Sequence, residues 1–185
     1  MKSIFHMFRC LFVFSVTRYY LALSRLVSYE QVTFKISLIP YRIGNDIRYS
    51  FYKKMLGHVG ENVLFSFGTV VTNKKTIIGN NVRLGPYNTI GWANVGNDIL
   101  TAQYVHILSG SEQHGFSRLD IPIISQPGKI RCVDIAGDNW IGANVVIMDD
   151  IGHGAILGSG SVVVSKVSVN AIAVGNPCRV IKTRK

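Results

Sequence analysis

An aliphatic residue recurs every six positions over much of the chain, and few folds accommodate such a repeat. It cannot line one face of a helix with 3.6 residues per turn, and it is too short and regular for an ordinary antiparallel sandwich. It fits a solenoid in which each short side places one aliphatic side chain inward, stacked on its counterparts in neighbouring coils. The units start at Val59, Phe65, Val71, Ile78, Leu84, Ile90, Val95, Thr101, Ile107, Ile135, Ile141, Ile147, Ile151, Leu157 and Val163.

The period is uneven at several points. One residue is gained before Ile78 and one is lost before Val95, while the corner after Ile147 is two residues short. We therefore expect a tighter corner at 148–150. Gly, Asn and Asp recur between the aliphatic positions, and these residues tolerate the backbone angles that tight corners require.

Three C-terminal segments are the most specific part of the pattern. They are Ile135-Ala-Gly-Asp-Asn-Trp-Ile-Gly-Ala-Asn-Val-Val-Ile147, Ile156-Leu-Gly-Ser-Gly-Ser-Val-Val163 and Ala173-Val-Gly-Asn-Pro-Cys-Arg-Val-Ile181. With the preceding repeats they make residues 59–182 resemble the hexapeptide-repeat acyltransferases. The resemblance implies an all-β fold, a left-handed parallel β-helix of triangular section, with a short helical N-terminal region and a C-terminal tail. It also implies about three hexapeptides per coil and assembly as a homotrimer.

The repeat is interrupted at 109–134, and a long excursion from a regular solenoid indicates a functional loop. His114 begins this loop and Asp120-Ile-Pro follows. The layout resembles that of sugar and capsular polysaccharide O-acetyltransferases, and the resemblance implies that His114 is catalytic. A neutral imidazole is suited to take the proton of an attacking hydroxyl and return it to a leaving thiolate near neutral pH.

The resemblance also implies acetyl-CoA as co-substrate, lying along the C-terminal coils between subunits. Two departures from the family pattern bear on its path: the short corner after Ile147, and Val167 where the family has an acid. Lys and Arg suit the phosphates of CoA, although each is also an ordinary solvated C-terminal charge. The positions that match the family's donor site are Ala143, Ser159, Ser165, Lys166, Arg179 and Lys182.

The function expected from these residues is acetyl transfer to a sugar hydroxyl, in surface polysaccharide or glycoconjugate biosynthesis. The alternatives are N-acetylation of an amino (nucleotide) sugar, O-acetylation of serine, and a catalytically inactive trimeric scaffold. A zinc enzyme of the same shape would need three histidines as metal ligands. The spacing of His106, His114 and His153 does not resemble the spacing in such zinc enzymes, so no metal is expected.

The net charge of +10 is concentrated at the two ends of the chain. Residues 1–57 carry +7 and residues 166–185 carry +5, while the middle carries −2. We expect a basic, helical N-terminal region at 1–57, with amphipathic helices at 4–28 and 43–56, and an acyltransferase domain at 58–185. The apolar stretches are shorter than the roughly 20 residues of a membrane span. The helices then pack on the body or another subunit, contact an anionic membrane surface, or do both.

Compartment and other partners follow from composition. Three cysteines, Cys10, Cys132 and Cys178, form neither a disulfide framework nor a zinc pattern. This predicts a cytoplasmic protein, with peripheral contact at the inner face of the cytoplasmic membrane as the further option. Nucleic acid is not an expected partner, because no stripe of basic and aromatic residues follows the solenoid.

Overall fold

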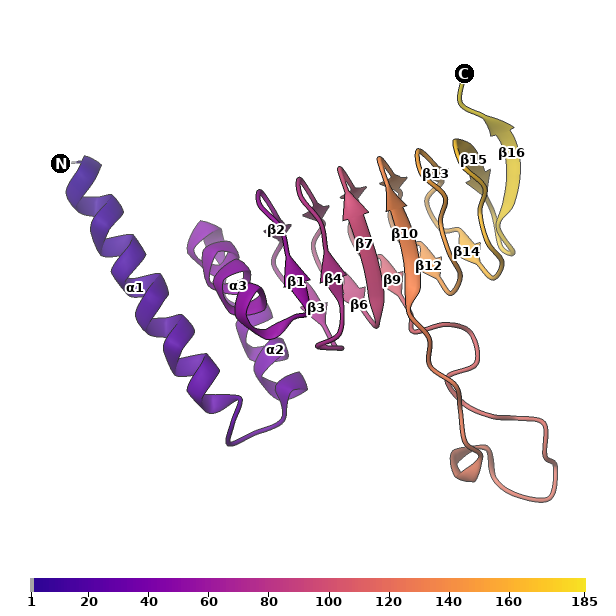
Figure 1. Ribbon diagram of the computed structural model, residues 1–185, viewed down its shortest axis with the longest axis horizontal. Helices are drawn as coiled ribbons and strands as arrows, with labels where there is room; N and C mark the ends of the chain where they lie inside the picture. Colours follow the sequence, from indigo (N-terminus) through magenta and orange to yellow (C-terminus); the bar gives the residue numbers. More distant parts are fainter. Residues whose placement is uncertain (1) are drawn as a thin grey trace.

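The computed structural model describes residues 2–185, with side chains from residue 5 onward. Three helices precede a column of short strands, and a long loop projects from that column (Figure 1). The helices are α1 (Lys2–Leu23), α2 (Tyr29–Ser37) and α3 (Tyr41–Met55), and a 3-10 turn, η1 (Ile123–Ser125), lies in the loop. The strands are β1 (His58–Val59), β2 (Leu64–Phe65), β3 (Val70–Val71), β4 (Ile77–Ile78), β5 (Arg83–Leu84), β6 (Thr89–Ile90), β7 (Ala93–Asn97), β8 (Leu100–Thr101), β9 (His106–Ile107), β10 (Val133–Gly137), β11 (Trp140–Ile141), β12 (Val146–Ile147), β13 (Ile156–Leu157), β14 (Val162–Val163), β15 (Ala171–Val174) and β16 (Arg179–Thr183).

The strands form three sheets, one for each side of a triangular coil. Sheet A has the order β1-β4-β7-β10, sheet B runs β2-β5-β8-β11-β13-β15-β16, and sheet C runs β3-β6-β9-β12-β14. Neighbours pair in parallel, except that β16 turns back and pairs antiparallel with β15. The predicted parallel β-helix is therefore confirmed, and β16 closes sheet B at the C-terminal end.

The register of the strands confirms the uneven period. His58 pairs with Ile77, 19 positions on, whereas Ile77 pairs with Asn94, 17 positions on. Coils after the loop are 16 positions long, as between Trp140 and Ile156. The tight corner expected after Ile147 is present, because the bridge residue Ile151 follows β12 after only three residues, and Val167 follows β14 in the same way.

The repeated aliphatic side chains fill the interior of the β-helix. Phe65, Leu84, Ile141 and Leu157 occupy equivalent positions of sheet B and are at most 1% exposed. Thr101 interrupts this column; its hydroxyl accepts a hydrogen bond from the Gly85 N–H at 2.9 Å and from the Asn88 side chain.

Stacked residues of one conformation form the corners. Asn62, Asn81 and Asp98 each have a φ between 56° and 58°, where Asn and Asp are tolerated better than most residues. Their side chains form a ladder across coils: Asn62 donates to Asn81 at 3.0 Å, and Asn81 donates to Asp98 at 2.9 Å. The expected use of Asn and Asp at corners is thereby confirmed.

Helices α2 and α3 cover the first coil, and their buried residues are continuous with the core of the β-helix. Fully buried Arg48 of α3 joins these parts (side chain 0% exposed). Its guanidinium donates to the carbonyls of Ile36 (3.0 Å), Ser37 (3.1 Å) and Ile39 (2.9 Å) at the end of α2, and to Phe65 of β2 (2.8 Å). A cation is favourable at a helix C-terminus, although burial lowers the pKa of Arg48 to about 10.

The helix boundaries differ from those expected. The first helix ends at Leu23 instead of residue 28, because the Ser28 side chain accepts the Gln31 N–H at 3.2 Å and starts α2. The sequence analysis missed α2. Helix α1 packs on α3 through a narrow stripe that includes buried Val13 and Thr17. Its opposite face is largely apolar, since Phe5, Phe8 and Phe12 are all more than half exposed.

Replacing Arg48 by Met should lower the free energy of unfolding by about 3 kcal/mol, because several buried carbonyls would lose their donor together. Urea denaturation followed by circular dichroism measures the loss. The control is Arg42→Met, which removes an exposed cation of the same helix and should cost less than about 0.5 kcal/mol. Equal losses for the two variants would contradict the role given to Arg48.

Candidate active site

The loop that interrupts the repeat leaves the β-helix at the edge where sheet C passes into sheet A. It follows β9 and ends at β10, and it extends well away from the coils (Figure 1). Its two arms are paired at the base. The Arg131 N–H donates to the Ser109 carbonyl at 2.9 Å, and the Lys129 N–H donates to the Glu112 carbonyl at 2.7 Å. The predicted excursion is therefore a two-armed projection with a defined stem.

An ion-pair cluster fixes this stem to the next coil. The Arg131 guanidinium forms ion pairs with Asp149 and with Asp150, the latter at 2.8 Å, and donates to the Cys132 carbonyl at 3.1 Å. Asp150 also accepts the Asp134 N–H at 3.0 Å. Burial alone would raise the pKa of Asp150, but the Asp134 N–H and Arg131 outweigh it, so that pKa lies below its ordinary value. The stem is thus fixed to the next coil at the start of β10.

Sequence reasoning missed this cluster although its signal was present. Asp149 and Asp150 occupy the corner whose shortness the sequence revealed, and two adjacent acids in a tight corner are suited to a cation that lies above them. Arg131 stands one coil earlier in the structure but 18 and 19 positions earlier in the sequence. Only the coil register brings the three residues together.

His114 lies on the first arm of the loop, and its side chain is exposed. The second arm passes close to its backbone, because a Cβ atom added at Gly128 would overlap the Gln113 carbonyl and the His114 N–H. Farther out, the buried Gln126 amide donates to the carbonyls of Arg118 (2.7 Å) and Ile121 (3.2 Å). The loop therefore has internal order on both sides of His114.

Three of the predicted donor-site residues lie together. Ser165, Lys166 and Arg179 line a groove of about 410 Å³ with Val164, Val167, Ala173, Cys178 and Val180. Ser165 and Lys166 occupy the same edge as the loop stem, one coil beyond Asp149 and Asp150. Lys166 is near enough to help lower the pKa of Asp150.

The other predicted donor-site residues lie elsewhere on the chain. Ala143 and Ser159 occupy successive coils at the edge between sheets B and C, where the Ala143 N–H donates to the Ser159 hydroxyl at 3.2 Å. Lys182 is on β16, paired with Ile172 in sheet B. One chain therefore does not bring all six residues together with His114: Ser165 and Lys166 lie at the edge of the loop stem, Ala143 and Ser159 lie at another edge, and Arg179 and Lys182 lie on β16 of sheet B.

Three polar or aromatic residues on the coils below the loop have different environments. Asn88 is fully buried, and its side chain accepts the Val105 N–H at 2.8 Å, so it is structural. Tyr87 stacks on Tyr104 with ring centroids 5.2 Å apart. Trp92 lies directly below the loop, where its backbone N–H donates to the Ser109 hydroxyl at 2.9 Å.

The other four histidines are dispersed over the chain. His6 is on α1, His58 and His106 are on strands β1 and β9, and His153 is in a turn between sheets A and B. Within residues 2–185, no three His, Cys, Asp or Glu side chains form a cluster suited to a metal ion.

Replacing Arg131 by Met should loosen the stem and make the loop roughly five to ten times more sensitive to chymotrypsin, because local opening lets the backbone beside the exposed Phe116 and Leu119 extend into the protease. Mass spectrometry of timed digests measures the change. The control is Arg118→Met, which removes the exposed ion pair with Asp120 at the loop tip and should change the rate less than about twofold.

The same anchor should weaken only in acid. Because folding lowers the pKa of Asp150 from 3.8, its stabilising effect is complete above that pH and is lost as the pH falls through the folded-state value. Cleavage of Arg131→Met at the wild-type rate would contradict the anchoring.

Known proteins share both the sequence pattern and the fold. Galactoside O-acetyltransferase of Escherichia coli (strain K12) is 31% identical over 145 residues, which cover 73% of this chain and 68% of that enzyme. A probable acetyltransferase of Mycobacterium tuberculosis is 30% identical over 133 residues; the match covers 69% of this chain but only 42% of that protein. No family model matches the sequence.

Solved structures agree with these relatives. A galactoside acetyltransferase in complex with coenzyme A superimposes with a TM-score of 0.71 at 23% identity, over 83% of this chain and 78% of that one. AntD, an N-acyltransferase from Bacillus cereus, gives a TM-score of 0.53 at 25% identity, over 72% and 86%. The fold of these neighbours confirms the predicted left-handed β-helix. The chain is an enzyme that belongs to the hexapeptide-repeat acetyltransferases.

Proposed function

We propose that the protein transfers the acetyl group of acetyl-CoA to a sugar hydroxyl, in the synthesis of a surface polysaccharide or glycoconjugate. The observation that carries this proposal is the arrangement along one edge of the β-helix. The His114 loop is anchored there to Asp149 and Asp150, and the groove of Ser165, Lys166 and Arg179 follows on the next coil. The loop that carries a proton acceptor is thus anchored one coil away from a cationic groove.

The groove fits the anionic parts of CoA. Lys166 and Arg179 have exposed side chains and form no ion pair with a carboxylate within the described residues, so both are available to phosphate oxygens. Acetyl-CoA would supply the acetyl group in activated thioester form. Ala143 and Ser159 would border its pantetheine arm, and Lys182 is a further cation at the same end of the chain.

His114 would act as general base and then as general acid. Its neutral imidazole accepts the proton of the sugar hydroxyl as the oxygen attacks the acetyl carbon, and it later donates that proton to the sulfur. Both substrates are held together, so positioning supplies much of the acceleration and no covalent enzyme intermediate is required. Backbone N–H groups of a neighbouring coil would stabilise the negative oxygen.

We infer assembly as a homotrimer, because the predicted donor-site residues lie on different edges of one chain. Ala143 and Ser159 lie on a different edge from the loop and the groove, so a second copy has to supply them to the same site. A contact between two different edges is heterologous, and three triangular columns close such contacts into a ring. The loop tip also exposes Leu119 (98%) and Ile124 (89%), which a neighbouring copy would cover.

Acetylation of an amine on a nucleotide sugar is the second candidate. AntD is an N-acyltransferase whose structure was solved with dTDP and 3-hydroxybutyryl-CoA, and it shares this fold. The same imidazole would take a proton from the neutral amine as its nitrogen attacks the acetyl carbon, and would then donate it to the leaving sulfur. Assays with amino sugars and with neutral sugars distinguish the two acceptors.

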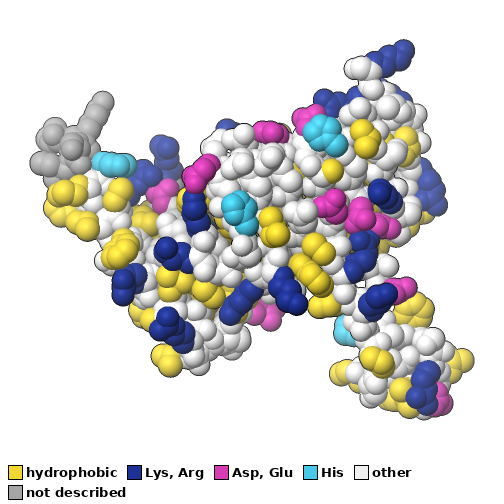
Figure 2. Space-filling model, viewed as in Figure 1, with side chains coloured by type: hydrophobic (Ala, Val, Ile, Leu, Met, Phe, Trp, Pro, Cys, Tyr) yellow, Lys and Arg dark blue, Asp and Glu magenta, His cyan; other side chains and the backbone are white. Residues whose placement is uncertain are grey.

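We also infer that α1 lies against the inner face of the cytoplasmic membrane. Its outer face exposes Phe5 (73%), Phe8 (61%) and Phe12 (53%), and Figure 2 shows apolar and basic side chains intermingled over this helical end. Aromatic residues flanked by cations bind the boundary of an anionic leaflet. No described helix is long and apolar enough to cross a membrane.

Replacing His114 by Ala should lower the rate of CoA release in the presence of acceptor by about 10²- to 10⁴-fold, because the acceptor proton would lose its base. The assay uses a panel of sugars, nucleotide sugars and oligosaccharides, and the KM for acetyl-CoA should change little. His153→Ala, which alters a turn histidine on another edge, is the control and should retain its rate. Unchanged turnover in His114→Ala would exclude the proposed mechanism.

Replacing both Phe8 and Phe12 by Ser should reduce binding to phosphatidylglycerol-containing vesicles at least tenfold, since two exposed aromatic side chains would no longer enter the lipid. Co-sedimentation measures bound protein. Val169→Ser, which alters an exposed apolar residue on the β-helix, should bind as the wild type does. Equal sedimentation of all three proteins would contradict membrane contact through α1.

A further inference from the structure

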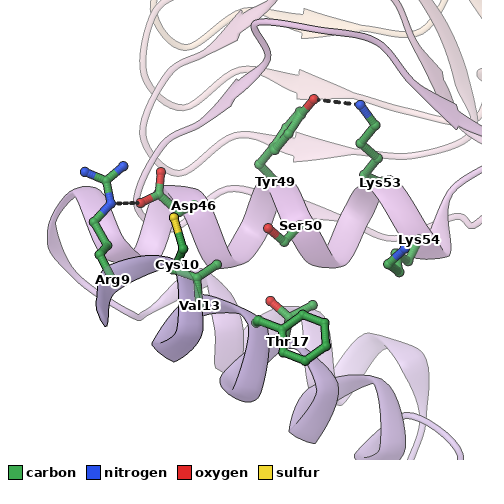
Figure 3. Close-up of a pocket in the computed structure, with 10 residues that line it drawn as sticks. Arg9, Cys10, Val13, Thr17, Asp46, Tyr49, Ser50, Lys53 and Lys54 are labelled. Carbon is green, nitrogen blue, oxygen red and sulfur yellow. Dashed lines mark hydrogen bonds and ion pairs between the residues drawn. The ribbon is translucent and has the colours of Figure 1, made fainter. Parts of the chain in front are cut away.

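A hollow between α1 and α3 stands apart from the acyl-transfer residues. It has a volume of about 660 Å³ and is lined by Cys10, Val13, Phe14 and Thr17 of α1, and by Tyr49, Ser50 and Lys54 of α3, among others (Figure 3). Its volume lies within the range of about 300 to 1,000 Å³ that is typical of sites for small organic ligands. It lies at the opposite end of the molecule from the C-terminal groove (Figure 1).

A buried hydroxyl inside this hollow has no partner. Thr17 is only 4% exposed, yet its Oγ1 atom forms no hydrogen bond in the described structure. Figure 3 shows this oxygen turned from α1 toward Ser50 of α3. Burying a hydroxyl without a hydrogen-bond partner is unfavourable, and an acceptor oxygen of a ligand would remove that cost.

Unpaired cations border one end of the hollow. A second hollow of about 410 Å³ adjoins it, shares Phe14 and Lys54 with it, and is also lined by Arg18 and Arg25. Within the described residues, none of these three cations forms an ion pair with a carboxylate. At the other end, by contrast, Arg9 Nε is neutralised by Asp46 at 2.8 Å (Figure 3).

We propose that the groove between α1 and α3 binds one phosphate-bearing lipid. Its hydrocarbon chain lies against Val13 and Phe14, and its phosphate lies at Lys54, Arg18 and Arg25. An apolar floor with a cationic end matches an amphiphile of this polarity, and Arg and Lys are the side chains that bind phosphate. Thr17 would donate to an ester or phosphate oxygen near the head of the chain.

This site is separate from insertion of α1 into a bilayer. The residues proposed for membrane contact, Phe5, Phe8 and Phe12, lie on the outer face of α1, whereas Val13 and Thr17 face α3. A lipid in the groove would complete the packing between the two helices. The proposal does not depend on acyl transfer, and each can fail without the other.

Titration calorimetry with dodecyl phosphate below its micelle concentration tests the site on the full chain. We expect one site per chain, with dodecanol and inorganic phosphate each binding at least tenfold more weakly. Ser50→Phe should fill the hollow and abolish binding, whereas Gln31→Phe, which adds the same side chain at an exposed position of α2, should leave it intact. Equal binding of dodecanol, or full binding by Ser50→Phe, would overturn the proposal.

Further variants test the apolar floor and the phosphate end of the groove separately. Val13→Trp fills the hollow from α1 and should reproduce the loss if Ser50→Phe does not fold. Arg18→Gln combined with Arg25→Gln should weaken the binding of dodecyl phosphate about tenfold and leave the binding of dodecanol unchanged. Lys35→Gln combined with Arg42→Gln removes the same charge outside the groove and should change the affinity for neither ligand. Retained affinity in the Arg18 and Arg25 variant would overturn the assignment of the phosphate end.

Competition identifies the source of the lipid. Displacement of dodecyl phosphate by lysophosphatidic acid would indicate a glycerol-based lipid, and displacement by farnesyl phosphate would indicate an isoprenoid carrier. Either result supports the site, and displacement by neither would overturn it. Acetyl transfer to a soluble sugar by Ser50→Phe should match the wild type, which separates a failure here from a failure of the proposed enzyme function.

Discussion

The closure of each coil around one inward side chain per side is the constraint on which the rest of the structure depends. Equivalent interior positions must stack on one another. Most of them therefore carry a large apolar side chain in a fixed register, as Phe65, Leu84, Ile141 and Leu157 do. Changes in coil length, from 19 to 17 to 16 positions, are therefore taken up at the corners. The same holds for the long loop, which leaves and rejoins the column at one corner. Variation is confined to the edges, and the candidate active site is built there.

This constraint explains which features could be predicted from sequence. The interior positions, the corner residues, the short corner after Ile147 and the excursion that carries His114 all repeat or interrupt a local period. Helix α2 and the contacts of Arg48 have no such period. Arg48 donates to carbonyls of α2 and β2, and a sequence does not reveal which buried acceptors a distant cation will meet. Asn88 shows the same limit: its side chain is fully buried and accepts the Val105 N–H of the next coil, a contact that the sequence does not reveal.

The residues of the candidate site are a prediction from the resemblance, and their geometry could not be read from the sequence. The resemblance located His114 and the C-terminal cations individually. The register then showed that Ser165, Lys166 and Arg179 share one groove, while Ala143 and Ser159 lie on another edge. A division of this kind follows from the triangular section, because residues from different corners of one coil face different directions. It is also the physical argument behind the proposed homotrimer.

The cations that make up the excess positive charge have different roles in different parts of the structure. Arg48, Arg131 and Arg184 are structural: they bind carbonyls or carboxylates and hold α2, the loop stem and the C-terminal tail in place. Lys166 and Arg179 face an open groove, which is the arrangement expected of cations that bind a phosphate. Arg18, Arg25 and Lys54 border an apolar hollow instead, and a free polyanion has no reason to prefer cations that lie beside Phe14 and Val13. Because cations beside an apolar floor favour a ligand with both characters, the N-terminal charge is better explained by a lipid than by a general affinity for polyanions.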